Sequence, residues 1–187
     1  WATDIRLRWS WALDYYRREQ YFEIEFHKYL QFTFLKQWTR LKEYANRKGI
    51  RIIGDIPIYV SMDSADAWAN PSLFQLDENN RPLAVAGCPP DGFSATGQLW
   101  GNPLYNWDYH RATGYQWWFS RLAHCYRLYD VVRIDHFRGF DEYFSIPADA
   151  ADATDGHWEK GPGIELFHAV RQALGEKAIM AEDLGYV

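Results

Sequence analysis

Three short apolar runs constrain the fold of this 187-residue chain most strongly, because acidic residues lie at the end of each run. The runs are IRIIGDIPIYV (50–60), VVRIDHF (131–137) and KAIMAEDLGYV (177–187), and longer segments with helical patterns separate them. Short runs rich in Ile and Val are typical of strands that are buried on both faces of a sheet. Alternation of such strands with helices predicts an α/β fold with a parallel sheet.

Helical periodicity marks the segments before and between these runs. From residue 22 to 45 apolar residues recur at steps of three or four, which predicts a long helix with a buried stripe, ended by Gly49. The same pattern predicts helices from about 115 to 129 and from 164 to 174. A shorter helix is expected in SADAWAN (64–70), because Pro71 follows it.

Two segments fit neither helical nor strand periodicity throughout. Residues 61–113 contain the short helix, a small hairpin around residues 78–80, and CPPDGFSATGQLWGNPLYNW (88–107). We expect the last of these to be a long ordered loop, since its many aromatic residues argue against disorder. Residues 141–162 form a second excursion from the sheet. Long loops inside compact domains are usually functional.

Composition excludes several classes of protein. The formal net charge of −5 argues against a nucleic-acid-binding surface. No apolar stretch approaches 18 residues, so no membrane span is expected. The two cysteines match neither a disulfide framework nor a metal-ligand spacing. Aromatic residues make up 18% of the chain, which is consistent with a surface that stacks on sugar rings, although core is the commoner place for any single ring. We expect a cytoplasmic protein that needs no cofactor.

The first run predicts a strand that ends near Gly54 with Asp55 at its tip, and Asp135 and Glu182 follow the apolar residues of the other two runs. Because the carboxyl ends of parallel strands in an α/β barrel meet at one face, these acids are expected to lie close together. Arg133 lies two residues before Asp135 on the same strand, so both side chains leave the same face and can pair. An ionised Asp beside a protonated carboxylic acid is the arrangement used in glycoside chemistry. Asp135 would attack the anomeric carbon, and Glu182 would protonate the departing oxygen.

Each of these residues also has an ordinary structural interpretation. An Asp at a strand end more often caps the next turn than takes part in catalysis, and Arg133 and Asp135 could form a structural pair. His136 could be a packing residue, and the aromatic residues of 93–107 could belong to a local core. A divalent-metal site formed by Asp135, His136 and Glu182 is a further alternative.

Four motifs in one order resemble the amylomaltases, the 4-α-glucanotransferases also called disproportionating enzymes. They span nearly the whole chain: GDIPIYV (54–60), PPDGFSATGQLWGNPLY (89–105), RIDHFRGF (133–140) and AEDLGY (181–186). These enzymes are (β/α)8-barrel relatives of the α-amylases. The resemblance implies that Asp135 is the nucleophile and Glu182 the acid and base. It also implies that Arg133 and His136 hold the nucleophile and the sugar.

The resemblance places further residues at the substrate. Asp55 and Tyr59 belong to the first motif, near the bound sugar. Four residues lie in the segment that resembles the family's lid loop over the acceptor subsites: Asp91, Phe93, Gln98 and Trp100. Some relatives carry an aromatic residue beside the aspartate at the tip of this loop, where this chain has Gly92.

The resemblance also implies that residues 1–187 are the central portion of a catalytic (β/α)8 barrel, with residues 61–113 as a lid subregion. A complete barrel takes about 250 residues, and the family's third acid, an Asp that follows a His, would lie beyond residue 187. The expected partners are malto-oligosaccharides and other α-1,4-glucans, and the isolated chain is expected to be inactive and to oligomerise. Two alternatives are an α-glucan-binding piece without catalysis and an α-amylase-type hydrolase.

Overall fold

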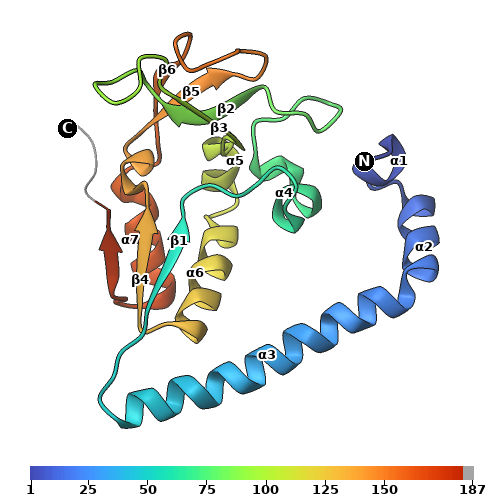
Figure 1. The fold of residues 1–187 in the computed structure, drawn as a ribbon, viewed down its shortest axis with the longest axis vertical. Coiled ribbons are helices and arrows are strands. Elements are labelled where there is room, and N and C mark those ends of the chain that lie inside the picture. The colour runs from blue at the N-terminus through green and yellow to red at the C-terminus, as the bar shows by residue number, and fades with distance from the viewer. Residues whose placement is uncertain (183–187) are drawn as a thin grey trace.

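A computed structural model describes residues 1–182 of the chain and contains two sheets (Figure 1). One sheet has three parallel strands in the order β1-β4-β7. Its members are β1 (Ile53–Pro57), β4 (Val131–Asp135) and β7 (Ile179–Ala181). These are the three runs recognised in the sequence, so the prediction of an α/β fold with parallel strands is confirmed.

Helices α6 (Gln116–Leu128) and α7 (Ile164–Leu174) connect these strands and pack against one face of the sheet (Figure 1). Both helices were predicted. Val132 and Ile134 of β4 are fully buried, and Trp118 and Leu122 of α6 belong to the same core cluster. Arg133 and Asp135 alternate with these residues and are only half-buried, because successive side chains of a strand point to opposite faces. The core therefore lies on the helix side of the sheet, and the charged residues lie on the other side.

The position of Asp55 differs from the expectation. Asp55 was expected at the tip of a strand that ends near Gly54, but β1 continues to Pro57, so Asp55 is the central residue of the strand. Pro57 is accommodated because it is the last residue of β1, where a missing amide hydrogen interrupts no ladder. Asp55 pairs in register with Arg133 of β4, which brings the two side chains to the same face.

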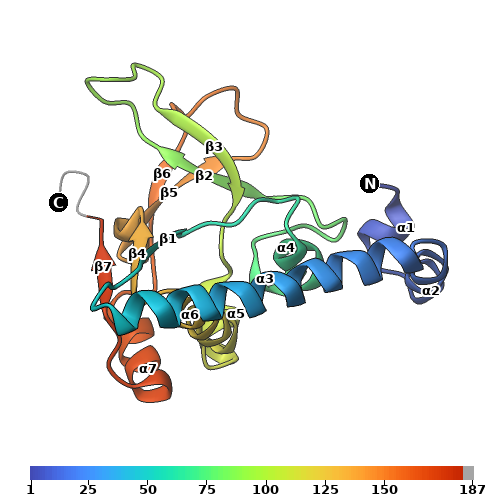
Figure 2. The same ribbon diagram turned by 60° about the horizontal axis from the view of Figure 1, so that its bottom comes forward.

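The second sheet is antiparallel, with strand order β3-β2-β5-β6, and lies beyond the C-terminal ends of β1 and β4 (Figure 1 and Figure 2). It consists of β2 (Ala84–Cys88), β3 (Gln98–Pro103), β5 (Glu142–Pro147) and β6 (His157–Lys160). The expectation of a loop without strands over 88–107 is therefore wrong for residues 98–103. Pairing with β2, through a register shift between Val85 and Gly87, gives this Gly- and Pro-containing segment its extended conformation.

Shorter elements surround this sheet. Helix α4 (Ala65–Ala69) begins at Ser64, whose hydroxyl accepts a hydrogen bond from the Ala67 amide. The 3-10 helices η1 (Pro71–Leu73) and η2 (Phe137–Phe140) and the helix α5 (Trp107–Ala112) complete this region. The predicted hairpin is present as a turn from Asp77 to Asn80, closed by an isolated bridge between Leu76 and Pro82.

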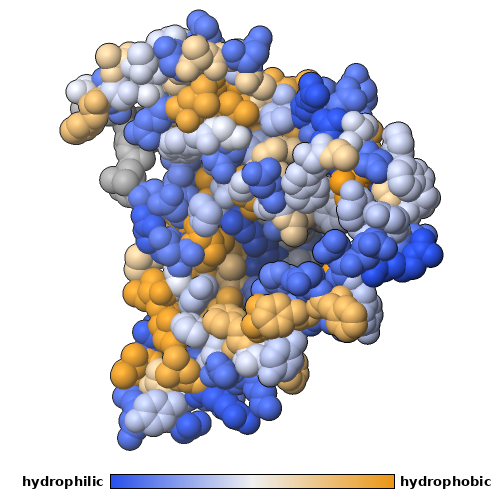
Figure 3. Space-filling model, turned by 45° about the vertical axis from the view of Figure 1, so that its right-hand side comes forward, coloured by the Kyte–Doolittle hydropathy of each residue, from blue (hydrophilic) through white to orange (hydrophobic). Residues whose placement is uncertain are grey.

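Helices α2 (Ser10–Glu19) and α3 (Tyr21–Arg47) form an arm outside the body of the molecule, and α1 (Thr3–Arg6) precedes this arm (Figure 1). The long helix was predicted, but its apolar stripe is not buried: Phe22 is 84% exposed and Phe26 is 54% exposed. Apolar side chains accordingly appear at the surface in the lower half of the molecule (Figure 3). Trp38 is partly buried against Tyr129, but no residue of α3 is fully buried within residues 1–182. Periodicity therefore predicted the helix correctly and the burial of its stripe wrongly.

Two side chains fix the last third of α3 to the body. The indole nitrogen of Trp38 donates to the carbonyl of Leu128 at 2.8 Å. The ammonium group of Lys42 donates to the carbonyls of Tyr126 and Tyr129 at 3.0 and 2.9 Å. These carbonyls at the end of α6 lack partners within that helix, so α3 supplies its C-terminal cap. No helix among residues 1–182 is both long and apolar enough to cross a membrane.

Buried His110 makes the stability of the chain depend on pH. Its ring is fully buried among aromatic residues, its Nε2 lies 3.1 Å from the Leu73 carbonyl, and burial lowers its pKa from 6.5 to about 4. The unfolded chain therefore binds a proton that the folded chain does not bind between these values. Stability from this group is present above pH 6.5 and is lost as the pH falls towards 4, by on the order of 3 kcal/mol in total.

We expect His110→Gln to reduce the loss of unfolding free energy between pH 7 and pH 5, measured by urea denaturation. His124→Gln at an exposed position of α6 is the control and should leave the pH dependence unchanged. Equal pH dependence in the two variants would contradict this assignment.

Candidate active site

The guanidinium of Arg133 contacts three carboxylates from three strands or strand ends. Its Nη1 donates to Oδ1 and Oδ2 of Asp55 at 2.8 and 2.9 Å. Its Nη2 donates to Oδ1 of Asp135 at 3.0 Å and to Oε1 of Glu182 at 2.6 Å. Parallel pairing explains the meeting, since Asp55 and Arg133 are register partners and Glu182 directly follows β7 on the other side of β4. The predicted approach of the three acids is observed.

Charge in this cluster is unbalanced. Three carboxylates share one guanidinium, and the pKa of Arg133 is raised above its ordinary value, first by its hydrogen bond to Asp55. Within residues 1–182, neither Asp55 nor Asp135 caps a turn with its side chain; both side chains pair with Arg133 instead. The capping interpretation therefore does not fit either residue. The cluster leaves excess negative charge on the face of the sheet that points away from the core.

Glu182 is held more firmly than Asp135. Its second oxygen, Oε2, accepts a hydrogen bond from the His136 amide at 2.6 Å, and its own amide donates to the Ile134 carbonyl at 3.3 Å. The Glu182 side chain is 14% exposed, whereas that of Asp135 is 47% exposed. Among residues 1–182, only Oδ1 of Asp135 has a hydrogen-bond partner, so Oδ2 accepts no hydrogen bond there. The Glu182 carboxylate is thus more enclosed than that of Asp135.

His136 turns the chain sharply after β4. Its backbone is left-handed, with φ 54° and ψ 45°, which is rare for a residue other than glycine and directs its amide to Glu182. Burial lowers the pKa of the imidazole, which favours its neutral form. Within the described part of the chain, its buried Nε2 has no hydrogen-bond partner. A buried nitrogen without a partner carries an energetic cost that a ligand hydroxyl would remove.

Two aromatic residues border His136. The Trp100 ring meets the imidazole edge-on with 4.8 Å between centroids, and Tyr59 lies 6.2 Å from the imidazole and 6.3 Å from Trp100. Tyr59 is buried, and burial raises the pKa of its hydroxyl, so the phenol stays protonated. Trp100 is exposed, and it therefore offers ring surface beside the carboxylates.

The remaining predicted residues lie further from the cluster. Gln98 reaches it only through Trp100, whose indole nitrogen donates to the Gln98 side chain at 2.9 Å. Asp91 accepts hydrogen bonds from the amides of Phe93 and Ser94 and so stabilises the loop between β2 and β3. Phe93 is fully exposed at this loop. In the described residues neither Asp91 nor Phe93 contacts the carboxylate cluster.

The metal-site alternative gains no support from this geometry. Arg133 lies among the carboxylates, and His136 faces Glu182 with its backbone amide. No group of three or more His, Cys, Asp or Glu side chains within residues 1–182 is arranged to hold a metal ion.

The family model described as 4-alpha-glucanotransferase matches residues 1–187. The chain belongs to this family. A 4-alpha-glucanotransferase from Streptococcus pneumoniae is 52% identical over 185 residues, covering 99% of this chain and 37% of the relative. One from Clostridium butyricum is 48% identical over 188 residues, covering all of this chain and 39% of the relative. The chain thus spans less than two fifths of the length of these relatives.

Solved structures of amylomaltases share the fold of this 4-α-glucanotransferase family member. An amylomaltase from Streptococcus agalactiae in complex with acarbose superposes with a TM-score of 0.96 at 50% identity, covering all of this chain and 38% of that chain. An amylomaltase from Corynebacterium glutamicum has a TM-score of 0.70 at 24% identity over 81% of this chain, which shows the fold alone.

Sequence reasoning missed Arg121, which fixes the chain just before Tyr59. Its guanidinium donates to the carbonyls of Pro57 and Ile58 at 2.6 and 2.9 Å and to the Tyr105 hydroxyl at 3.3 Å. The Tyr105 hydroxyl in turn donates to the Ile58 carbonyl at 2.7 Å. These acceptors are mainly backbone carbonyls that any sequence would supply, so no pattern of side chains identifies the contact in advance.

We expect Arg133→Ala to destabilise the chain at pH 7, because three neighbouring carboxylates lose the cation that contacts them all. Thermal unfolding measures this, with Arg111→Ala in a surface pair with Glu165 as the control. A loss of stability no larger than that of the control would contradict the assignment.

Proposed function

We propose that this chain is part of a 4-α-glucanotransferase that moves α-1,4-glucan segments between malto-oligosaccharides by a retaining double displacement. One observation supports this proposal most directly. The carboxylates of Asp135 and Glu182 both accept hydrogen bonds from the Arg133 guanidinium, in a chain that belongs to this family. The acarbose complex of the similar Streptococcus agalactiae amylomaltase also supports a carbohydrate ligand.

In the proposed first step, Oδ2 of Asp135 attacks the anomeric carbon. The glycosidic bond breaks, its oxygen takes a proton from Glu182, and a covalent glycosyl ester forms on Asp135. In the second step Glu182 removes the proton from an acceptor's 4-hydroxyl, which attacks the anomeric carbon and displaces the carboxylate. No cofactor takes part, because the chemistry is nucleophilic and acid–base.

The contacts of Glu182 place a condition on this mechanism. Both of its oxygens accept hydrogen bonds in the structure, one from Arg133 and one from the His136 amide. A proton on either oxygen would replace one of these contacts. We propose that a bound sugar draws the Arg133 guanidinium towards Asp135 and Asp55, which releases Oε1 of Glu182 for the proton.

Transfer rather than hydrolysis requires a positioned acceptor and restricted access of water. We propose that residues 61–113 serve as a lid, with Asp91, Phe93, Gln98 and Trp100 at the acceptor sugar and Asp55, Tyr59, Arg133 and His136 at the donor. The full exposure of Phe93 supports this role, because its ring has no other contact surface in the described residues. Gly92 would leave this lid with one aromatic surface fewer than in some relatives.

We propose that residues 1–187 form the central portion of a (β/α)8 barrel in the cytoplasm. The outer edges of β1 and β7 have no further strand beside them within the described residues, although buried parallel strands normally have neighbours on both sides. Further strands of the parent protein would complete the barrel and contribute its third acid. Without them, the isolated chain would bind glucan at most and would associate through its open edges.

Asp135→Asn in the full-length protein should abolish disproportionation of maltotriose, because an amide cannot form the glycosyl ester. Product analysis by chromatography measures this, and the control is Asp108→Asn, the same change at a surface residue of α5. Turnover retained in the Asp135 variant would refute the nucleophile. A ratio of glucose transferred to glucose released well below one in the unmodified protein would favour the hydrolase alternative instead.

The isolated 187-residue chain should show no measurable transfer from maltotriose and should form oligomers, because its site lacks residues and its sheet has open edges. Activity assays and light scattering measure these properties. A monodisperse monomer would contradict the expected association, and transfer by the isolated chain would contradict the need for further catalytic residues.

A further inference from the structure

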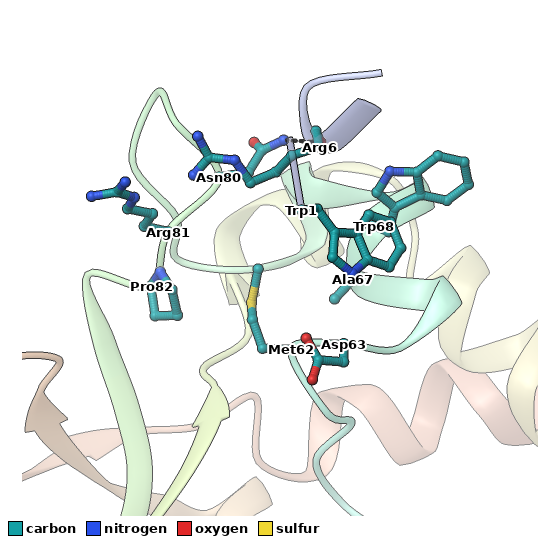
Figure 4. A pocket seen from close by; sticks show the side chains of 9 residues that line it. All are labelled: Trp1, Arg6, Met62, Asp63, Ala67, Trp68, Asn80, Arg81 and Pro82. Carbon is teal, nitrogen blue, oxygen red and sulfur yellow. Dashed lines mark hydrogen bonds between the residues drawn. The ribbon is translucent and has the colours of Figure 1, made fainter. Parts of the chain in front are cut away.

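A pocket of about 220 Å³ lies between α1, α4 and the turn before β2 (Figure 4). Both ribbon views place α1 and α4 on the side of the molecule opposite β7, so the pocket is remote from Glu182 (Figures 1 and 2). None of the residues in the carboxylate cluster lines it. The residues that matter for its chemistry are Trp1, Arg6, Met62, Asp63, Trp68 and Arg81.

The walls of this pocket are held together by hydrogen bonds. The indole nitrogen of Trp68 donates to the Ile5 carbonyl at 2.8 Å, and Arg8 donates to the Trp68 carbonyl at 3.2 Å. The side-chain amide of Asn80 donates to the Arg6 carbonyl at 3.4 Å. These contacts fix α1 on α4 and on the turn, so the hollow is part of the fold and is formed before any ligand arrives.

Apolar and polar groups converge on the pocket. Trp1 and Trp68 supply two indole rings 5.8 Å apart at an angle of 58°, and Met62 lies between α4 and the turn (Figure 4). Because the rings are tilted rather than stacked, they do not cover each other's faces. A ring-shaped ligand with apolar faces and polar edges matches this combination of surfaces.

Polar side chains at the pocket have donors and acceptors without a hydrogen-bond partner in the described part of the chain. The Nε of Arg6 is buried and has no partner within residues 1–182, and the only contact of that guanidinium is with the Thr3 hydroxyl at 3.5 Å. In the same part of the chain, the side chains of Asp63 and Arg81 make no hydrogen bond or ion pair. A buried donor without a partner is energetically unfavourable, and a ligand acceptor at the Arg6 Nε would remove that cost.

We propose that this pocket binds one neutral sugar unit of an α-glucan, at a site separate from the carboxylate cluster. The arginines donate to hydroxyl oxygens, Asp63 accepts from hydroxyl hydrogens, and the indoles pack on the apolar face of the ring. The negative charge of Asp63 disfavours an anionic ligand, which two arginines alone would attract. The choice of a glucan rests on the proposed function; the choice of a neutral sugar rests on the pocket itself.

Affinity electrophoresis of the full-length protein in gels that contain soluble starch tests the site. Asp63→Asn with Arg81→Ala should weaken the starch affinity about five-fold, which corresponds to roughly one lost hydrogen bond. Because maltotriose is too short to span both sites, its disproportionation should fall less than the affinity for starch in this variant. The matched control is Asp108→Asn with Arg111→Ala, which makes the same two changes in a surface ion pair of α5. Starch retardation equal to that of the control would overturn the proposal.

Two further measurements separate the alternatives. Arg81→Ala alone, at an exposed side chain, should weaken the affinity about two-fold and remains informative if the double variant does not fold. Inorganic phosphate should not release the unmodified protein from starch, and release that depends on Arg81 would identify an anion site and overturn the neutral sugar. If starch retards the protein through this pocket while maltotriose is not disproportionated, the proposed function fails and the pocket assignment stands.

Discussion

The contact of one guanidinium with three carboxylates is the interaction on which the site depends. Arg133 is the only residue that touches Asp55, Asp135 and Glu182 together in the described structure, and these acids come from segments 80 and 47 residues apart in the chain. Without this cation, the acids would repel one another at the distances that the parallel strands impose. The register of β1 with β4 places Asp55 beside Arg133, and the position of Glu182 directly after β7 brings this third acid to the same guanidinium.

The two faces of β4 explain how charge is tolerated at the end of an apolar run. Val132 and Ile134 contribute to the core beneath α6 and α7, while Arg133 and Asp135 face away from it. Burial of the apolar side chains stabilises the strand, and the charged pair retains contact with solvent and with other carboxylates. A shift of one residue in this strand would exchange the two sets and would destroy both core and site.

Local patterns predicted the parallel strands, the helices α6 and α7 and the pairing of Arg133 with Asp135, because each follows from the spacing of neighbouring residues. Strand β3 could not be found in this way, since its extended form comes from pairing with β2 and not from its own composition. The position of Asp55 within β1 depends on how far pairing with β4 continues, which the sequence of β1 alone does not state. Arg121 and the exposed stripe of α3 likewise depend on partners that periodicity does not specify.

The arm formed by α2 and α3 is tied to the body at both ends, by Arg8 and Trp68 near α1 and by Trp38 and Lys42 near the end of α3. The arm therefore connects two parts of the body, and the 27 residues of α3 alone span about 40 Å. A cut in the chain between the two anchors would leave each piece held by one anchor. Loss of one anchor would instead leave the whole arm held at a single end, so a small rotation at that end would move the other end through a much larger distance.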